Sequence, residues 1–544
     1  MKKLFIWFIV LLAFVLRFYR LADYPALNAD EAAIGYNAYS LIETGKDEHG
    51  NPWPIHFQSF NDFKPGLYFY LVLPFVKLLG LTELAVRIPG ALIGVLTVLV
   101  LYFLVKELFK NGRLALVASL FLAISPWHLH FSRGGWEVNT ATFLIVLGVW
   151  LFLKALEKPK YYVFSIISLT LSLYAYHAAR IIVPLLGFGL LVIYWRQLTK
   201  NIKTLSLAVA VGVILLFPLA RDMTKGAVVS RAAGVGLFAD TGPLSRINEQ
   251  RGEHSDFQSL GAKILHNKAV NYGLAFGQNW AEHFWGEFLF LSGDDIQRNK
   301  VPETGVLYLI DLLFIAVSLF AIAKNTKNWS LVLWWLLIAP FAAALTFQSP
   351  HALRAQNMVI PLTIISAYGL VTILSWLRNQ ESKKLLVISH WLLAILILWN
   401  FLRYEHMYWV HLAKEYPFSS QYGVKELAAY VKENGDRYQK IWITDRYDQP
   451  YILLLFYGAD GYSLKFSPER FQSGHVLTPR DRFGFSTVRD FDKFHFETVD
   501  FDKIRPENPN ALIIGTDEEI PAEANIVKKI YGSNGYLYFE AVAN

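Results

Sequence analysis

The chain contains no cysteine, which excludes disulfide bonds and thiolate metal sites. Charged side chains are also scarce, at 17% of the 544 residues, against about 25% in ordinary soluble domains. Phosphate-binding loops and dinucleotide-binding fingerprints are absent as well. The shortage of charge is concentrated in residues 1–402, where long apolar runs alternate with short basic loops. The composition therefore predicts a helical membrane domain over 1–402 and a soluble α/β domain over 403–544.

Eleven apolar runs approach the length of about 20 residues that a membrane-spanning helix needs. We expect spans at residues 4–19, 86–105, 114–131, 138–156, 161–175, 181–195, 204–220, 305–323, 329–347, 357–377 and 385–402. Lys and Arg gather in every second loop, so the positive-inside rule accounts for the net charge of +7 without a nucleic-acid partner. The first run lacks a small-x-small cleavage site, so we expect it to remain as a span. This alternation predicts a multi-pass cell-membrane protein with a cytoplasmic N-terminus and an extracytoplasmic C-terminal domain.

Two of the expected outer loops are long. The first, residues 20–65, contains a helical pattern that begins near Asp30 and is typical of a helix lying in the membrane interface. Its apolar face consists of Ile34, Ala38, Leu41 and Ile42. Residues 66–80 are apolar but short, which predicts a re-entrant or surface helix. The second long loop, residues 221–300, is rich in aromatic and polar residues.

The C-terminal domain shows a mixed pattern. Residues 423–431 place Val424, Leu427, Ala428 and Val431 on one face of a helix. Three short apolar runs, at 440–444, 451–457 and 511–514, predict buried β-strands. We expect this domain to recognise the acceptor or a partner, so that its removal would spare donor binding.

Five polar motifs fall in the outer loops, and each has a structural interpretation. Asn28 and Glu31 are spaced as a helix capping box, which does not explain the intervening Asp30. Lys64 and Pro65 could form a loop with the proline in the first turn of the next helix. Arg133 and Glu137 are four residues apart and could form a helical ion pair. Interfacial tyrosines and snorkelling arginines account for the last two motifs, Tyr176-His177-Ala-Ala-Arg180 and His351-Ala-Leu-Arg354.

The outer position of these basic residues favours a functional interpretation. The positive-inside rule should deplete outer turns of arginine, yet Arg133, Arg180 and Arg354 each occupy one. Ionisable groups close to a membrane are functional candidates. Several cations with carboxylates nearby would suit an anionic phosphate head group.

The same residues give the chain a family resemblance. It resembles the C-type membrane glycosyltransferases, in particular protein O-mannosyltransferases and lipid A aminoarabinose transferases. The resemblance is strongest over residues 16–180 and extends more weakly to about 375. Its ordered motifs are Leu16-Arg17-Phe-Tyr-Arg-Leu21, Pro25, Asp30-Glu31-Ala-Ala-Ile-Gly-Tyr-Asn-Ala-Tyr39, Lys64-Pro65, Arg87-Ile-Pro89, Ser125-Pro126-Trp127-His128, Phe131-Ser-Arg133, Tyr176-His177-Ala-Ala-Arg180 and Pro350-His-Ala-Leu-Arg354. Gly66 stands where the family often has a second proline, and Glu137 where many relatives have aspartate.

The resemblance implies an inverting transfer of a sugar from a polyprenyl-phosphate donor to a hydroxyl of a lipid, polysaccharide or protein. Asp30 would be the general base, and Glu31 would orient Asp30, the acceptor or a metal. The candidates for the donor phosphate are Lys64, Arg133, Arg180 and Arg354. Further substrate-binding candidates are Glu137, Tyr176, His177 and His351. The resemblance implies no certain cofactor and leaves a divalent cation open.

Two other classes of protein are compatible with the topology. A transporter or flippase of lipid-linked sugars would carry its charged groups near the membrane midplane, whereas the charges here lie at the outer ends of the expected spans. A receptor with a ligand-sensing C-terminal domain would not explain Asp30, Lys64 and the outer arginines.

Overall fold

The computed structural model of the protein describes residues 2–60, 62–224, 234–379, 383–417, 419, 421–459, 466–480 and 486–544. The chain folds as two compact units, each assembled from separate segments. The helical unit comprises Met1–Arg17, Ile93–Ser132 and Glu137–Glu405, and the mixed unit comprises Phe18–Leu92, Arg133–Trp136 and His406–Asn544. The mixed unit therefore joins the first outer loop to the C-terminal segment.

The helical unit is built largely from the predicted apolar runs, although the helix at 83–109 belongs to it only from Ile93 onward. Each run contains a helix. These are α1 (Lys2–Phe18), α4 (Glu83–Phe109), α5 (Gly112–Ile124), α6 (Pro126–Ser132), α7 (Glu137–Ala155), α8 (Tyr161–Leu173), α9 (Ala179–Leu198), α10 (Ile202–Met223), α15 (Leu309–Lys324), α16 (Ser330–Ile338), α18 (Val359–Arg378) and α19 (Lys383–His406). Among the described residues, five helices are long and apolar enough to cross a membrane, or six if α5 and α6 together form one span. The count of eleven spans is therefore not confirmed. The run at 114–131 bends by 56° between α5 and α6, where Pro126 removes a backbone donor.

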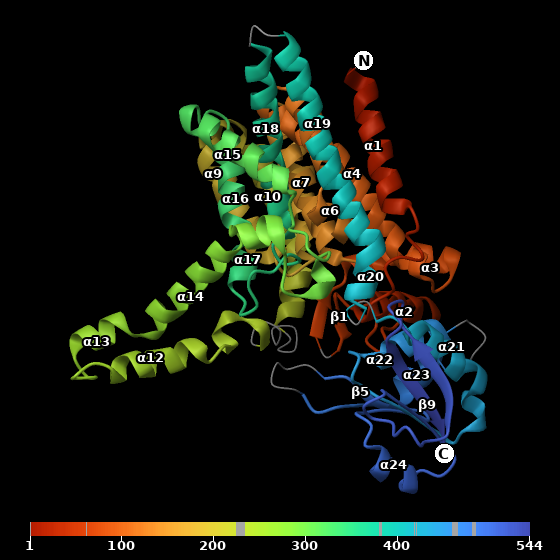
Figure 1. Ribbon diagram of the computed structural model, residues 1–544. Helices are drawn as coiled ribbons and strands as arrows, with labels where there is room; N and C mark the ends of the chain where they lie inside the picture. The colour runs from red at the N-terminus through yellow and green to blue at the C-terminus, as the bar shows by residue number, and fades with distance from the viewer. Residues whose placement is uncertain are drawn as a thin grey trace. The chain divides into compact units, whose positions relative to one another are not determined.

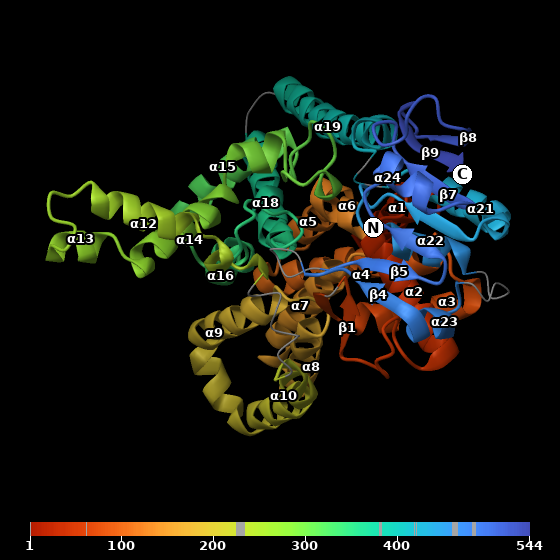
Figure 2. The ribbon, with the colours of Figure 1, turned by 90° about the horizontal axis from the view of Figure 1, so that it is seen from below.

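The second long loop contains three helices in its described part. It contains α12 (Gly242–Gly252), α13 (Leu260–Leu265) and α14 (Lys268–Glu282), while residues 225–233 of this loop lie outside the described residues. Both ribbon views show these three helices extending away from the other helices of the helical unit (Figures 1 and 2). Short elements complete this unit: η1 (Thr199–Asn201), η2 (Leu237–Ala239), η3 (Glu287–Leu291), η4 (Gln297–Asn299), α17 (Phe341–Ala344) and η5 (Gln356–Met358).

The C-terminal segment of the mixed unit forms a seven-stranded sheet in the order β4-β5-β6-β3-β7-β9-β8. The central strand β3 pairs in parallel with β6 and β7, and the other pairs are antiparallel. The strands are β3 (Lys440–Ile443), β4 (His475–Leu477), β5 (Val488–Phe491), β6 (Phe494–Phe496), β7 (Ala511–Gly515), β8 (Ile526–Tyr531) and β9 (Leu537–Ala543). The expected α/β character, the helix at 423–431 and the strands at 440–444 and 511–514 are confirmed.

Helices cover both faces of this sheet. One face packs against α21 (Val424–Asn434), α22 (Pro450–Gly458) and α23 (Pro468–Gly474), and the other packs against α24 (Phe501–Glu507). The prediction of a strand at 451–457 is wrong, because this run forms α22. A short apolar run does not distinguish a buried strand from a buried helix, and Pro450 at the first helical position favours the helix. The segment also contains η6 (Met407–His411), α20 (Leu412–Glu415) and η8 (Gly435–Arg437).

Helix α2 (Ala29–Thr44) lies in the core of the mixed unit. Ile34 and Leu41 are buried as expected, but Tyr36 and Asn37 on other sides of the helix are also fully buried. The expectation of an interfacial helix with one apolar face is therefore wrong. The unit encloses α2 with α3 (Leu67–Leu79), α22 and α23, and residues of all four helices share one hydrophobic cluster.

This shared core changes the expectation for the C-terminal segment. Gln472 of α23 donates hydrogen bonds to Ser40 Oγ at 3.0 Å and to Thr44 Oγ1 at 3.1 Å, and Tyr36 donates to the carbonyl of Phe466 at 3.0 Å. Removal of 410–544 would expose α2 on these sides. We therefore expect the deletion to disrupt the folding of the first outer loop rather than to spare donor binding.

Gly35 tests the packing of α22 on α2. A Cβ atom at this position would lie 2.5 Å from Phe456 Cε2 and 2.8 Å from Val86 Cγ2. Gly35→Ala should therefore destabilise the protein by about 1–3 kcal/mol through overpacking. Gly273→Ala is the control, because no atom lies within 4 Å of its added Cβ, and there alanine should stabilise α14 by up to about 1 kcal/mol. Thermal unfolding of the purified protein measures both, and an unchanged midpoint for Gly35→Ala would contradict the packing.

Candidate active site

The N-terminus of α2 is capped by its own sequence. Asn28 Oδ1 accepts the Glu31 backbone N–H at 3.0 Å, and Glu31 Oε2 accepts the Asn28 backbone N–H at 3.3 Å. This reciprocal pair is the predicted capping box, which is therefore confirmed. A residue distant in sequence completes the cap, because the Ala29 N–H donates to Gln421 Oε1 at 2.6 Å. The backbone on both sides of Asp30 is thus held in place.

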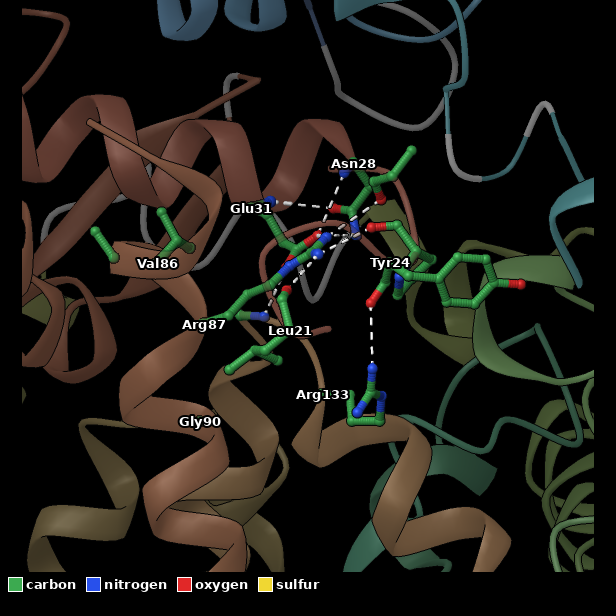
Figure 3. A network of polar contacts seen from close by, with 12 residues as sticks. Leu21, Tyr24, Asn28, Glu31, Val86, Arg87, Gly90 and Arg133 are labelled. Carbon is green, nitrogen blue, oxygen red and sulfur yellow. Dashed lines mark hydrogen bonds and ion pairs between the residues drawn. The ribbon is translucent and has the colours of Figure 1, made fainter. Parts of the chain in front are cut away.

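Glu31 forms a buried ion pair with Arg87, as Figure 3 shows. Arg87 Nε lies 2.7 Å from Glu31 Oε1, and Arg87 Nη2 lies 2.8 Å from Oε2. Glu31 Oε1 also accepts the Gly135 N–H at 2.9 Å. The remaining guanidinium donors reach three backbone carbonyls of the preceding loop, those of Leu21, Pro25 and Ala26. Glu31 is therefore fully engaged in holding segments of the mixed unit together.

Asp30, the adjacent residue, has a different environment. Its carboxylate forms an ion pair with the Lys64 ammonium, and the two side chains are 22% and 10% exposed. Lys64 lies on β2 (Asp62–Pro65), which pairs antiparallel with β1 (His56–Ser59) in a hairpin. The interpretation of 62–65 as a loop with Pro65 in a first helical turn is therefore wrong. The hairpin presents to Asp30 a cation that is largely shielded from water.

Arg133 is buried and engaged with aromatic residues. Its Nε donates to the Tyr408 hydroxyl at 3.0 Å, and its guanidinium carbon lies 4.7 Å from the centre of the Trp409 ring. Its Nη2 donates to the Tyr19 carbonyl at 2.9 Å and lies 3.5 Å from the carbonyl of Tyr24, the contact drawn in Figure 3. These contacts join the turn 133–136 to other segments of the mixed unit, so they favour a structural task for Arg133.

The Tyr176–Arg180 motif and Glu137 lie in the helical unit. Arg180 follows the first residue of α9, where its Nη1 lies 3.1 Å from His177 Nδ1 and its Nε donates to the Leu173 carbonyl at 3.3 Å. Tyr176 is buried, and Glu137 is buried in the first turn of α7. Arg180 and His177 are thus neighbours in the structure.

The His351–Arg354 motif also lies in the helical unit. Arg354 donates to Thr346 Oγ1 at 2.7 Å and to Gln348 Oε1 at 3.2 Å. His351 is buried, and its backbone N–H donates to His283 Nε2 at 3.1 Å. Burial lowers the pKa of His283 to about 4, so this imidazole is neutral near pH 7 and can accept the bond. The four predicted phosphate ligands divide equally between the two units.

Two residues of the mixed unit received no role from the sequence. Arg87 stands in the expected span 86–105, and an arginine at the end of an apolar run is the signal that would have identified it. Glu48 is fully buried, and its backbone N–H donates to Asn37 Oδ1 at 2.9 Å. Burial and the charge of Asp47 raise the pKa of Glu48 to about 8. No pattern around Glu48 predicted its burial.

The acidic side chains near the start of α2 already have partners. The described parts of the chain hold no group of three or more His, Asp or Glu side chains that could bind a metal ion. Lys64 already supplies a positive charge to Asp30, and Arg87 and Gly135 occupy the oxygens of Glu31.

The two adjacent carboxylates should differ sharply in their effect on stability. Glu31→Gln would leave the buried Arg87 charge without its partner, a loss of about 3–5 kcal/mol for a buried pair. Asp30→Asn keeps an amide oxygen that can accept a hydrogen bond from the shielded Lys64 ammonium, so it should cost less, about 1 kcal/mol. Thermal unfolding of the two variants measures the difference, and equal midpoints would contradict the assignment of Glu31 as the structural member.

Comparisons with known proteins agree with the fold. Residues 64–220 match the family described as dolichyl-phosphate-mannose-protein mannosyltransferase. An uncharacterized protein of Aquifex aeolicus (strain VF5) is 25% identical over 173 residues, which are 32% of this chain and 34% of that protein. The chain thus spans about a third of the length of this relative.

Solved structures extend the similarity to nearly the whole chain. ArnT from Cupriavidus metallidurans bound to undecaprenyl phosphate is 12% identical, with a TM-score of 0.51 over 99% of this chain and 97% of that one. The oligosaccharyltransferase AglB from Archaeoglobus fulgidus, in complex with an inhibitory peptide and a dolichol-phosphate, is 15% identical. Its TM-score is 0.51, over 84% of this chain and 63% of that one. The C-type glycosyltransferase fold expected from the motifs is confirmed.

Proposed function

We propose that this membrane protein transfers a sugar from a polyprenyl-phosphate donor to an acceptor hydroxyl, with Asp30 as the general base. The observation that carries the proposal is the pairing of a partly exposed Asp30 carboxylate with a shielded Lys64 ammonium. The family match supports the reaction class, because its description names a dolichyl-phosphate-linked sugar. The lipid phosphates in the ArnT and AglB structures support the class of donor.

The proposed reaction is a single displacement. The acceptor oxygen attacks the anomeric carbon while the bond from that carbon to the phosphate oxygen breaks. The acceptor proton passes to the Asp30 carboxylate, and polyprenyl phosphate leaves with the electron pair. Attack opposite to the leaving group inverts the anomeric centre. A second carboxylic acid is not needed, unlike in glycoside hydrolysis, because cations can stabilise the departing phosphate.

Lys64 would couple donor binding to the release of the base. Its ammonium is paired with Asp30. A donor phosphate would compete for this ammonium, because charge-assisted hydrogen bonds to phosphate are strong. Once Lys64 turns to the phosphate, the Asp30 carboxylate becomes available to accept a proton. Arg180 and Arg354 belong to the other unit and stay predictions from the family motifs, whereas the internal contacts of Arg133 argue against a phosphate contact there.

The outer orientation of the site is also part of the proposal. It rests on the alternating basic loops, which place the segment 403–544 outside the cell membrane. Cleavage of this segment by protease added to intact cells reports its side directly. Sugar transfer by purified protein in detergent distinguishes the enzyme from a flippase, since no two compartments are present.

Asp30→Asn is the primary test of the general base. The amide keeps the shape of the side chain but cannot accept the proton, so transfer should slow by about 10²–10⁴-fold. Donor binding and the unfolding midpoint should remain near those of the wild type. Asp492→Asn is the matched control, because it removes a carboxylate from a more exposed pair with Arg470 and should leave the rate unchanged. A fully active Asp30→Asn enzyme would refute the assignment.

Lys64→Ala and Arg354→Ala test the donor contacts. Loss of a charged hydrogen bond of about 1.5–3 kcal/mol predicts a donor dissociation constant raised about 10- to 100-fold. Arg354→Lys should restore binding only in part if the arginine contact is bidentate. Lys110→Ala removes an exposed lysine paired with Glu107 and serves as the control. Titration with a short-chain polyprenyl phosphate measures each affinity, and unchanged values in both alanine variants would remove these residues from the site.

A further inference from the structure

A cavity lies in the mixed unit at the opposite end of α2 from Asp30. Its volume is about 620 Å³, which is within the range of about 300–1,000 Å³ typical of ligand sites. The C-terminal half of α2, the end of α3 and the end of α22 form its walls. None of the residues considered for donor binding or catalysis lines this cavity.

The lining combines aromatic rings with one charge of each sign. Tyr39, Phe456 and Tyr457 supply the rings, and Glu43 and Lys77 supply the charges. Glu43 and Lys77 are exposed, and neither forms an ion pair or side-chain hydrogen bond within the described parts of the chain. Apolar and aromatic walls with a few uncommitted polar groups are typical of a ligand-binding site.

We infer that this cavity binds a neutral glycan that forms part of the acceptor, an inference that rests on the proposed transferase function. A sugar ring presents hydroxyl groups that both donate and accept, which suits the Glu43 carboxylate and the Lys77 ammonium. Its C–H face is attracted to the negatively charged faces of aromatic rings. The balanced charges of Glu43 and Lys77 favour a neutral ligand over an anionic one.

A lipid chain is a poorer occupant of the same cavity. Acyl chains packed against Glu43 and Lys77 would remove water from both charges without giving them hydrogen bonds in return. Exposed Leu78 and Leu79 lie beside the cavity on α3, so a phospholipid is nevertheless the alternative that the experiment must distinguish.

The distance from Asp30 indicates which part of the acceptor would bind here. Tyr39 and Glu43 follow Asp30 by nine and thirteen residues on one helix. A rise of 1.5 Å per residue places them about 14–20 Å from Asp30 along the helix axis. A single sugar cannot span this distance, so the cavity would hold a remote part of an extended glycan, carried by a glycolipid or a polysaccharide.

Leu81→Trp tests the cavity directly, because Leu81 lines it and a larger side chain would fill it. The probe is an array of neutral and acidic oligosaccharides, from disaccharides to hexasaccharides, incubated with the purified full-length protein. We expect neutral oligosaccharides to bind the wild type and Leu81→Trp to weaken that binding about tenfold or more, a loss of about 1.4 kcal/mol. Leu78→Trp is the matched control: Leu78 is 80% exposed and does not line the cavity, so binding should not change.

A second variant tests the cavity independently, in case Leu81→Trp does not fold. Glu43→Gln combined with Lys77→Ala alters only exposed side chains, and it should weaken binding while keeping the wild-type unfolding midpoint. Absence of neutral-glycan binding, or equal binding by the two tryptophan variants, would overturn the inference. Binding of phosphatidylglycerol vesicles that depends on Leu81 would also overturn it and identify a lipid as the occupant.

The transferase function and the glycan cavity can fail separately. Asp30→Asn should bind oligosaccharides like the wild type, because Asp30 is absent from the cavity lining. Glycan binding without any Asp30-dependent transfer would refute the proposed function and leave the cavity as a binding site. Asp30-dependent transfer by a protein that binds no neutral glycan would refute the cavity inference alone.

Discussion

The buried ion pair between Glu31 and Arg87 is the constraint on which the candidate site depends. Burying two charges is costly unless they are paired and their remaining donors and acceptors are satisfied. Here the backbone N–H groups of Gly135 and Asn28 also donate hydrogen bonds to the Glu31 carboxylate, and backbone carbonyls accept the remaining hydrogen bonds of the Arg87 guanidinium. Satisfying both groups requires the start of α2, the preceding loop, the start of α4 and the turn 133–136 to meet at one point. The position of Asp30, next in the chain to Glu31, follows from this arrangement.

Two neighbouring carboxylates thereby acquire different environments. Glu31 is buried, and its carboxylate is fully hydrogen-bonded within the buried ion pair with Arg87, so its charge stabilises the fold. Asp30 is partly exposed, and its partner is a lysine that a phosphate could attract away. Differences in environment commonly separate the roles of adjacent carboxylates in this way. The C-terminal segment contributes to the same arrangement, since Gln421 caps the first amide of α2 and α22 packs on its side.

The sequence could predict features that depend on local patterns. The capping box requires only Asn28 and Glu31 at the correct spacing, and the apolar face of 423–431 follows helical periodicity. Features that depend on long-range contacts could not be predicted in this way. The pairing of Glu31 with Arg87 joins residues 56 positions apart, and the burial of α2 depends on α22, which lies hundreds of residues later. The helix at 450–458 was mistaken for a strand because a short apolar run carries both signals.

The site residues also divide into those that a local motif identifies and those whose contacts depend on distant parts of the chain. The family motif pointed to Asp30 and Lys64, and the structure brings them together although no local pattern predicts their contact. The motif could not predict that Arg133 contacts Tyr408 and Trp409, because those aromatic residues lie far along the chain. In the sequence Arg87 is only one residue of a motif, and its ion pair with Glu31 depends on the fold.

An experimental structure of the purified protein with a short-chain polyprenyl phosphate would test the central claim most directly. We expect a phosphate oxygen within hydrogen-bond distance of Lys64 Nζ, a separated Asp30 carboxylate that faces the phosphate-bearing end of the lipid, and an intact Glu31–Arg87 pair. A phosphate bound elsewhere, with Lys64 still paired to Asp30, would contradict the account.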